Sequence, residues 1–119
     1  VAELCWALIL AADRNLVQQK EELREGVWNK ATHVDTATHR GIKGRTIGIL
    51  GFGTIGKEVA RRAAAFGMSV LVWGRSYQQA PGNVRVPELG FDVESCATIQ
   101  EVAERSDVVS VHLPKAPGT

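Results

Sequence analysis

The first part of the chain carries an apolar stripe at helical spacing. Its positions are Leu4, Leu8, Ala11, Ala12, Leu16 and Leu23. Intervals of three and four residues predict one helix over residues 1–23, which ends near Gly26. Residues 27–44 show no such period and are mostly polar around Trp28, which predicts a loop or an extended arm. Residues 1–44 are therefore predicted to form a leading helix and an arm, distinct from residues 45–119.

Short β-rich segments alternate with helical ones over residues 45–119. Strands are predicted at residues 46–50, 69–73, 91–94 and 108–113. Helices are predicted at residues 55–67 and 99–105, the second one capped by Thr98. Residues 74–90 are predicted to be a loop, with a turn at Pro81-Gly82-Asn83. This alternation predicts an α/β fold of the Rossmann-like, doubly wound kind: a parallel sheet between helices in three α/β/α layers, with strand order 3-2-1-4.

A glycine-rich turn joins the first predicted strand to its helix. It reads Gly51-Phe52-Gly53-Thr54-Ile55-Gly56 and fits the spacing G-x-G-x-x-G. Gly51 makes the tight turn, Gly53 lets the backbone approach a pyrophosphate, and Gly56 lets the helix pack on the strand. Free N–H groups near Thr54 and Ile55 are expected to bind phosphate oxygens. The alternative is an ordinary strand-to-helix turn, and the strand and helix on either side favour the dinucleotide site.

The end of the second predicted strand bears on which dinucleotide is bound. In sites for NAD an Asp or Glu there binds the ribose 2′-hydroxyl, whereas this chain has Gly74, Arg75 and Ser76. A glycine leaves room for a 2′-phosphate, and an arginine pairs with it. The sequence therefore predicts NAD(P) binding with a preference for NADP over NAD. The alternative is that Arg75 is a solvated loop charge.

Composition narrows the remaining classes of function. The chain has 119 residues, 45% hydrophobic and 23% charged, with a formal net charge of +1, which is typical of a soluble globular domain. It lacks the basic stripe of a nucleic-acid-binding protein. Its longest apolar run, residues 4–12, is too short to span a membrane. Cys5 and Cys96 are far apart and have no ligand or disulfide motif, which predicts no metal site and a cytoplasmic location.

With these residues in place, nearly the whole chain resembles the cofactor-binding domain of the D-isomer-specific 2-hydroxyacid dehydrogenases. Five phrases carry the resemblance: Val1-Ala2-Glu3; Arg24, Gly26 and Trp28; residues 44–56 around the glycine turn; Phe66-Gly67-Met68; and residues 106–114, with Pro117 and Thr119 after them. Two positions depart from the family pattern. Gly74 stands where most members carry Asp, and Thr54 stands where many carry Arg.

The resemblance implies roles for further residues. Thr54 and Ile55 would meet the pyrophosphate. His112, Leu113, Pro114 and Thr119 would line the cofactor at the carboxyl end of their strand, where ligands of such sheets bind. A structural hydrogen bond made by His112 is an equal alternative. This histidine does not correspond to the catalytic histidine of the family.

The implied activity is that of an NAD(P)-dependent oxidoreductase, which moves a hydride between the nicotinamide and a 2-oxo or 2-hydroxy acid. The arginine, glutamate and histidine of that chemistry have no counterpart here, so no catalytic residue is assigned. The chain starts inside a helical pattern and stops after a predicted strand. We therefore expect a fragment: residues 45–119 a partial cofactor domain, the substrate domain absent, and the fragment inactive alone. The leading helix and arm suggest a homodimer.

Three other functions share parts of this pattern. A nucleotide-sensing corepressor uses the same kind of domain without catalysis, and only residues outside this chain separate it from an enzyme. An adenosylhomocysteinase-like NAD domain also has a glycine turn and a Phe-Gly phrase, but His112-Leu113-Pro114 argues against it. A methyltransferase that uses S-adenosylmethionine usually needs an acidic residue where Gly74 stands.

Overall fold

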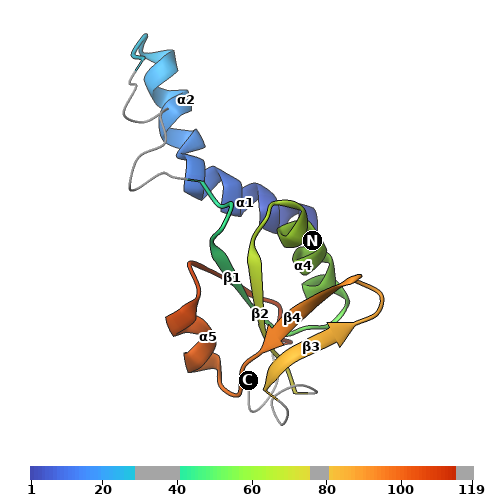
Figure 1. The fold of residues 1–119 in the computed structure, drawn as a ribbon. Coiled ribbons are helices and arrows are strands. Elements are labelled where there is room, and N and C mark those ends of the chain that lie inside the picture. Colours follow the sequence, from blue (N-terminus) through green and yellow to red (C-terminus); the bar gives the residue numbers. More distant parts are fainter. Residues whose placement is uncertain (29–40, 76–80, 115–119) are drawn as a thin grey trace.

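The computed structural model describes residues 1–28, 41–75 and 81–114 (Figure 1). Its helices are α1 (Ala2–Arg14), α2 (Leu16–Arg24), α4 (Thr54–Ala65) and α5 (Ile99–Arg105). Its strands are β1 (Thr46–Leu50), β2 (Ser69–Trp73), β3 (Gly82–Val86), β4 (Phe91–Ser95) and β5 (Val108–Val111). These strands form one sheet in the order β3-β4-β2-β1-β5. No described helix is long and apolar enough to cross a membrane.

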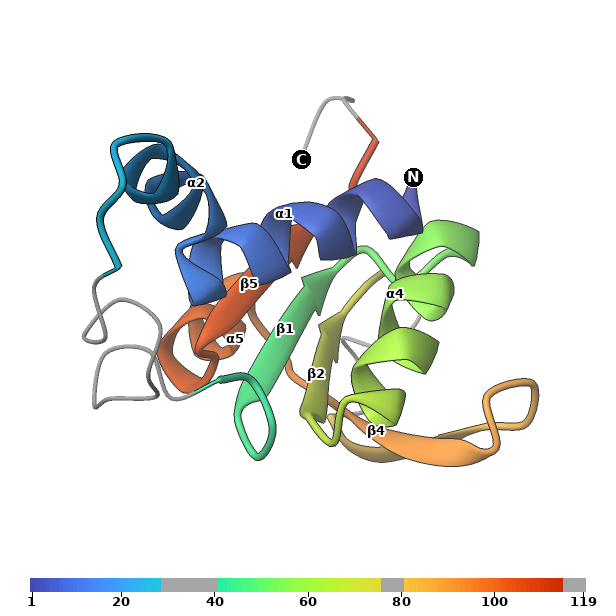
Figure 2. The same ribbon diagram turned by 90° about the horizontal axis from the view of Figure 1, so that it is seen from above.

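The sheet is covered on both faces, which confirms the predicted α/β class. On one face α4 packs against β1 and β2, and α1 packs against α4. On the other face α5 packs against β1 and β2 (Figure 2). Strand β1 has buried side chains that pack toward the helices on both faces of the sheet. Ile47 and Ile49 are fully buried in the cluster that includes residues of α1 and α4. Leu50 belongs to the smaller cluster with Val102 of α5.

The predicted strand order is also confirmed. The four predicted strands correspond to β4, β2, β1 and β5 in that spatial order, and their pairings are all parallel. Two of these strands differ at one end from the prediction: β4 extends to Ser95, and β5 stops at Val111. Thr98 caps α5 as predicted, because its hydroxyl accepts a hydrogen bond from the backbone N–H of Glu101 at 3.1 Å.

The prediction of a loop over residues 74–90 was wrong in part. Strand β3 lies in it and pairs antiparallel with β4, with Gly82 opposite Ser95 and Asn83 opposite Glu94. The predicted turn at residues 81–83 is therefore a strand start, and the chain turns at residues 87–90 instead. Its residues do alternate, with Asn83 and Arg85 exposed and Val86 buried, but the alternation covers only five residues and begins inside the Pro81-Gly82-Asn83 turn signal. Pairing with β4 decides the conformation.

The prediction of one leading helix was wrong as well. Asn15 takes a left-handed conformation, with φ 56° and ψ 39°, and separates α1 from α2. Asparagine tolerates this region better than most residues, so the chain bends here while the apolar spacing continues. No residue of α2 is buried, and this helix projects from the body of the protein (Figure 1).

Candidate functional site

The glycine turn after β1 is held between the ends of two neighbouring strands. The backbone N–H of Gly51 donates to the carbonyl oxygen of Trp73, at the end of β2, at 2.7 Å. Gly51 has φ +97°, and a Cβ atom there would lie 2.6 Å from the carbonyl oxygen of His112. Only glycine fits such a conformation beside another backbone. The first glycine of the motif is therefore fixed by the close approach of the segment after β5.

The other two glycines have opposite surroundings. A Cβ atom on Gly56 would strike the carbonyl oxygen of Gly51 and approach Ile49 Cγ2 to 3.2 Å, so this glycine lets α4 pack against the turn. Around a Cβ atom on Gly53 there is nothing within 4 Å. Gly53 is also the N-cap of α4, where no side chain caps the helix. Thr54 and Ile55, the first two residues of α4, are exposed. An exposed helix start without a side-chain cap fits an anionic group such as a pyrophosphate.

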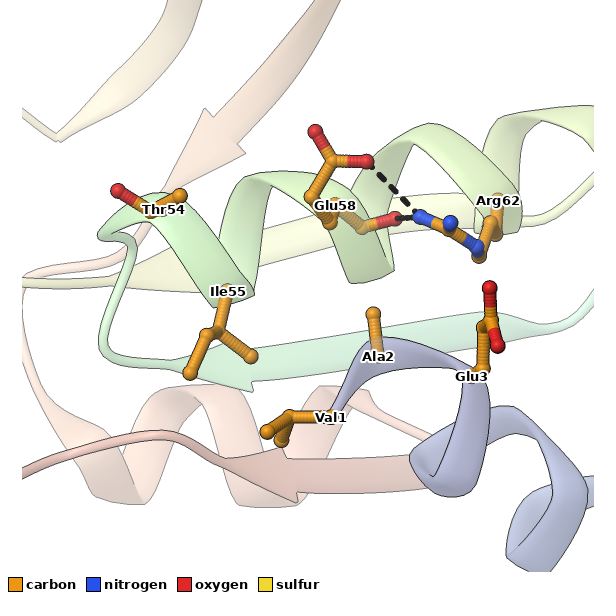
Figure 3. Close-up of a pocket in the computed structure, with 7 residues that line it drawn as sticks. All are labelled: Val1, Ala2, Glu3, Thr54, Ile55, Glu58 and Arg62. Carbon is orange, nitrogen blue, oxygen red and sulfur yellow. Dashed lines mark hydrogen bonds and ion pairs between the residues drawn. The ribbon is translucent and has the colours of Figure 1, made fainter.

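A pocket of about 370 Å³ lies beside this turn (Figure 3). It is lined by Val1, Ala2 and Glu3 from the start of α1 and by Thr54, Ile55, Glu58 and Arg62 from α4. Arg62 Nη1 donates to both the backbone oxygen and the carboxylate of Glu58, at 2.9 Å each. The hydrogen bond from Arg62 is the main cause that lowers the pKa of Glu58. The start of α1 therefore lies beside the turn, a neighbourhood that the local sequence pattern did not reveal.

The carboxyl ends of three parallel strands bring most of the predicted residues together. Leu50 of β1 is in register with Trp73 of β2 and with Val111 of β5. The glycine turn, Gly74 and His112 therefore all come directly after strands that end at one edge of the sheet. Ser76 and Thr119, which the sequence analysis also assigned to the site, lie outside the described residues.

At the end of β2, Gly74 is buried and Arg75 is exposed. Residues 69–75 contain no carboxylate, so nothing in this segment repels a phosphate on the ribose. The guanidinium of Arg75 lies at the limit of the described segment. Its pairing with a 2′-phosphate stays a prediction.

The imidazole of His112 makes the structural hydrogen bond that was one of its two predicted roles. His112 Nε2 lies 2.7 Å from Ser110 Oγ, and the backbone N–H of His112 donates to the carbonyl oxygen of Leu50 at 2.7 Å. Burial lowers the pKa of His112. Leu113 is half-buried against the cluster under α5, and Pro114 is exposed. Contact of these three residues with a cofactor stays a prediction.

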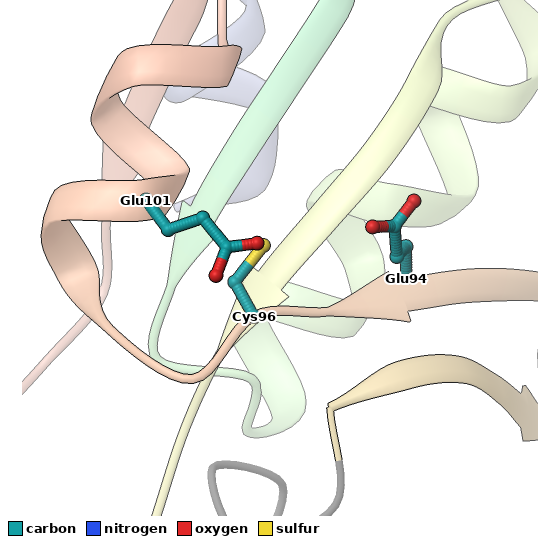
Figure 4. Close-up of side chains that lie close together, drawn as sticks. All are labelled: Glu94, Cys96 and Glu101. Atoms are coloured by element: carbon teal, nitrogen blue, oxygen red, sulfur yellow. The ribbon is translucent and has the colours of Figure 1, made fainter.

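A second group of titratable side chains, Glu94, Cys96 and Glu101, lies between β4 and α5 (Figure 4). Their potential ligand atoms lie within 4.8 Å of one another. Arg105 forms ion pairs with Glu94 at 2.7 Å and with Glu101 at 2.9 Å, so a guanidinium already balances the carboxylates. Burial raises the pKa of the Cys96 thiol, which disfavours the thiolate that a metal would need. The ion pairs of Arg105 join β4 to α5 across this cluster.

Comparison with known proteins decides the family. Residues 6–119 match the model of the "D-isomer specific 2-hydroxyacid dehydrogenase, NAD binding domain". The chain belongs to this family. It is 37% identical over 118 residues to the D-3-phosphoglycerate dehydrogenase of Mycobacterium bovis, which covers 99% of the chain and 20% of the relative. The family assignment favours the dehydrogenase prediction over an adenosylhomocysteinase-like domain or a methyltransferase.

Solved structures of dehydrogenases and reductases share the fold of this NAD-binding domain. An acyclic imino acid reductase in complex with NADPH and D-Arg has a TM-score of 0.75 and 30% identity, covering 98% of the chain and 33% of the relative. An NAD-dependent formate dehydrogenase from Staphylococcus aureus in complex with NAD has a TM-score of 0.75 and 28% identity, covering 98% and 31%. The chain therefore spans between a fifth and a third of the length of these relatives.

Proposed function

We propose that this chain binds a nicotinamide dinucleotide, NADP in preference to NAD, as the cofactor-binding part of a D-2-hydroxyacid dehydrogenase. The observation that carries the proposal is the glycine turn. Gly51 and Gly56 are packed against backbone and Gly53 opens onto free space at the uncapped start of α4. This combination of a tight turn and an accessible helix N-terminus suits a pyrophosphate.

Different residues around the turn are proposed to contact different parts of the cofactor. Backbone N–H groups at Thr54 and Ile55 bind the pyrophosphate, and the hydroxyl of Thr54 adds a neutral donor. Gly74 leaves space at the ribose of the adenosine, and Arg75 pairs with the 2′-phosphate of NADP. His112, Leu113 and Pro114 border the cofactor from the end of β5. Ser76 and Thr119 complete the proposed set.

The bound nicotinamide supplies or accepts the hydride, and this chain orients it. The open turn at Gly53 fixes the pyrophosphate, and the neighbouring strand ends hold the two halves of the cofactor at one edge of the sheet. The substrate is a small 2-oxo or 2-hydroxy acid. Its binding and its proton transfer require residues that this chain does not supply, so we expect no turnover from the chain alone.

Exposed apolar residues on the leading segment suggest a homodimer. They are Leu16, Val17, Leu23, Val27 and Trp28. Residues of this kind on a projecting helix are suited to contact a second copy. We propose a cytoplasmic homodimer, without a nucleic-acid partner. Light scattering over a wide range of concentration tests it, and a monomer throughout would contradict it for this chain.

The proposed cofactor is tested by calorimetric titration of the chain with NADPH and, separately, NADH. We expect NADPH to bind more tightly, and Arg75→Ala to remove about 1.5–3 kcal/mol of that affinity, the usual value of a hydrogen bond to a charged group. Arg85→Ala is the matched control, because Arg85 is exposed on β3 and pairs with Asp92. Equal or tighter binding of NADH would contradict the NADP preference. Binding of neither would contradict the proposed function of this chain.

A further inference from the structure

A row of side-chain hydrogen bonds runs from α1 to the residue after β5. Cys5 Sγ lies 3.0 Å from Ser110 Oγ, and Ser110 Oγ lies 2.7 Å from His112 Nε2. Ser110 and His112 are two positions apart, so their side chains leave the extended backbone on the same face of the sheet. That face is the one covered by α1, which brings Cys5 to Ser110 across 105 positions of sequence.

This row lines a pocket of about 380 Å³ between α1 and β5. Val1 lines the same pocket, and it also lines the pocket beside Thr54 and Ile55. The first turn of α1 thus adjoins both the phosphate-binding turn and the imidazole of His112. The imidazole of His112 and the proposed phosphate-binding turn therefore border neighbouring pockets that share Val1.

The chemistry of the three groups allows a consistent set of donor and acceptor roles along the row. Burial lowers the pKa of His112 and so favours the neutral ring, in which one nitrogen is an acceptor, and we assign that role to Nε2. The Ser110 hydroxyl has one proton, which it can donate to Nε2, and it can accept the proton of the Cys5 thiol. With Nε2 as the acceptor, the proton of the ring is on Nδ1. Ser110 is itself buried, so the geometry of the row is fixed by packing.

We propose that Ser110 and Cys5 are positioning residues that fix the orientation and the tautomer of the His112 ring, and through it strengthen dinucleotide binding. The effect on affinity rests on the proposed function, whereas the effect on the ring does not. Neither residue contacts the cofactor in this proposal. Ser110 acts directly on the ring, and Cys5 acts through Ser110.

The test replaces the hydroxyl and measures both effects in the whole 119-residue chain. In Ser110→Ala we expect the Kd for NADPH, measured by calorimetry, to rise about 2- to 10-fold, the usual value of one hydrogen bond. We expect the ¹⁵N spectrum of the His112 ring to change from one Nδ1-protonated tautomer to a mixture. Ser110→Thr, which keeps the hydroxyl, should leave both the Kd and the ring tautomer as in the unchanged protein. Ser69→Ala is the matched control, because Ser69 is exposed at the start of β2.

Cys5→Ala gives a second variant that leaves the Ser110–His112 bond in place. We expect a smaller change in the ring spectrum than in Ser110→Ala, in the same direction. An unchanged tautomer in Ser110→Ala would overturn the positioning role. A changed tautomer with an unchanged Kd would overturn its coupling to the cofactor. If no form of the chain bound NADPH or NADH, the proposed function would fail, and the ring spectra would still decide the positioning role.

Discussion

The glycine turn and helix α2 are two short segments that differ in how closely they are packed against the rest of the protein. In the turn, Gly51 and Gly56 each lie so close to backbone atoms that a single added carbon would collide with them. In α2 no residue is buried, and Val17 is 70% exposed. The turn is specified by contacts within the chain. The apolar residues of α2 remain half or more exposed, among them Leu16 at 50% and Leu23 at 52%.

The largest expected effect comes from adding one carbon to the tightest glycine. Gly51→Ala should lower the free energy of unfolding by about 3 kcal/mol or more, because it adds a clash with the His112 carbonyl to an unfavourable positive φ. Urea denaturation measures the loss. Gly53→Ala is the matched control, since nothing lies within 4 Å of the added atom. It should keep the stability within about 1 kcal/mol and reduce dinucleotide affinity instead. Equal stability of the two variants would contradict this view of the turn.

A pair of valines compares the two regions directly. Val59 on α4 is fully buried and Val17 on α2 is 70% exposed. Val59→Ala should lower the free energy of unfolding by about 2 kcal/mol, because it leaves a cavity in the core. Val17→Ala should change it by less than about 0.5 kcal/mol. Both values come from urea denaturation at low protein concentration. A large loss in Val17→Ala that grows with protein concentration would show that α2 is packed in an oligomer.

Replacement of Asn15 tests the break between α1 and α2. Asn15→Ala should lower the free energy of unfolding by about 1 kcal/mol, because alanine is less stable than asparagine in the left-handed region. Asn15→Gly should retain the stability of the wild type within about 0.5 kcal/mol, since glycine adopts this conformation without steric cost. Thermal unfolding followed by circular dichroism compares the three proteins. If Asn15→Ala were more stable than the wild type, the two helices would be able to join into one.

The smallest expected effect is the pH dependence due to His112. Burial lowers its pKa in the folded protein below the ordinary value of 6.5. The unfolded chain therefore binds more protons than the folded one just below pH 6.5, and stability falls as the pH decreases through this window. His112→Gln should make the free energy of unfolding depend less on pH between pH 7 and pH 5. An identical pH dependence in the two proteins would contradict the lowered pKa.

Much of the fold was predictable because it depends on short-range pattern. The strand–turn–helix sequence around residues 46–65 has a glycine at each position where a side chain would collide, and the parallel strands are short β-rich segments between helices. The family phrases are equally local. Strand β3 was missed because its alternation covers only five residues and begins inside a Pro-Gly-Asn turn signal. The break at Asn15 was missed because the apolar spacing continues across it.

In the candidate site, too, some features were predictable from the sequence and others were not. The sequence located the glycine turn, Gly74 and the segment after β5, which all come after strands and so share one edge of the sheet. It did not place the start of α1 beside Thr54 and Ile55, nor Cys5 beside Ser110. Those contacts join residues that are far apart in sequence, 105 positions in the case of Cys5 and Ser110. They depend on how a helix crosses the sheet, which no local spacing encodes.

The sequence by itself determined the α/β class, the glycine turn and the family, because each depends on short local patterns along the chain. Only the tertiary structure decided the addition of β3 to the sheet, the separation of α1 from α2 and the row from Cys5 to His112. The physical reason is that hydrogen bonds between strands and packing between layers form after the chain has folded back on itself. Their partners are set by the whole arrangement rather than by either segment.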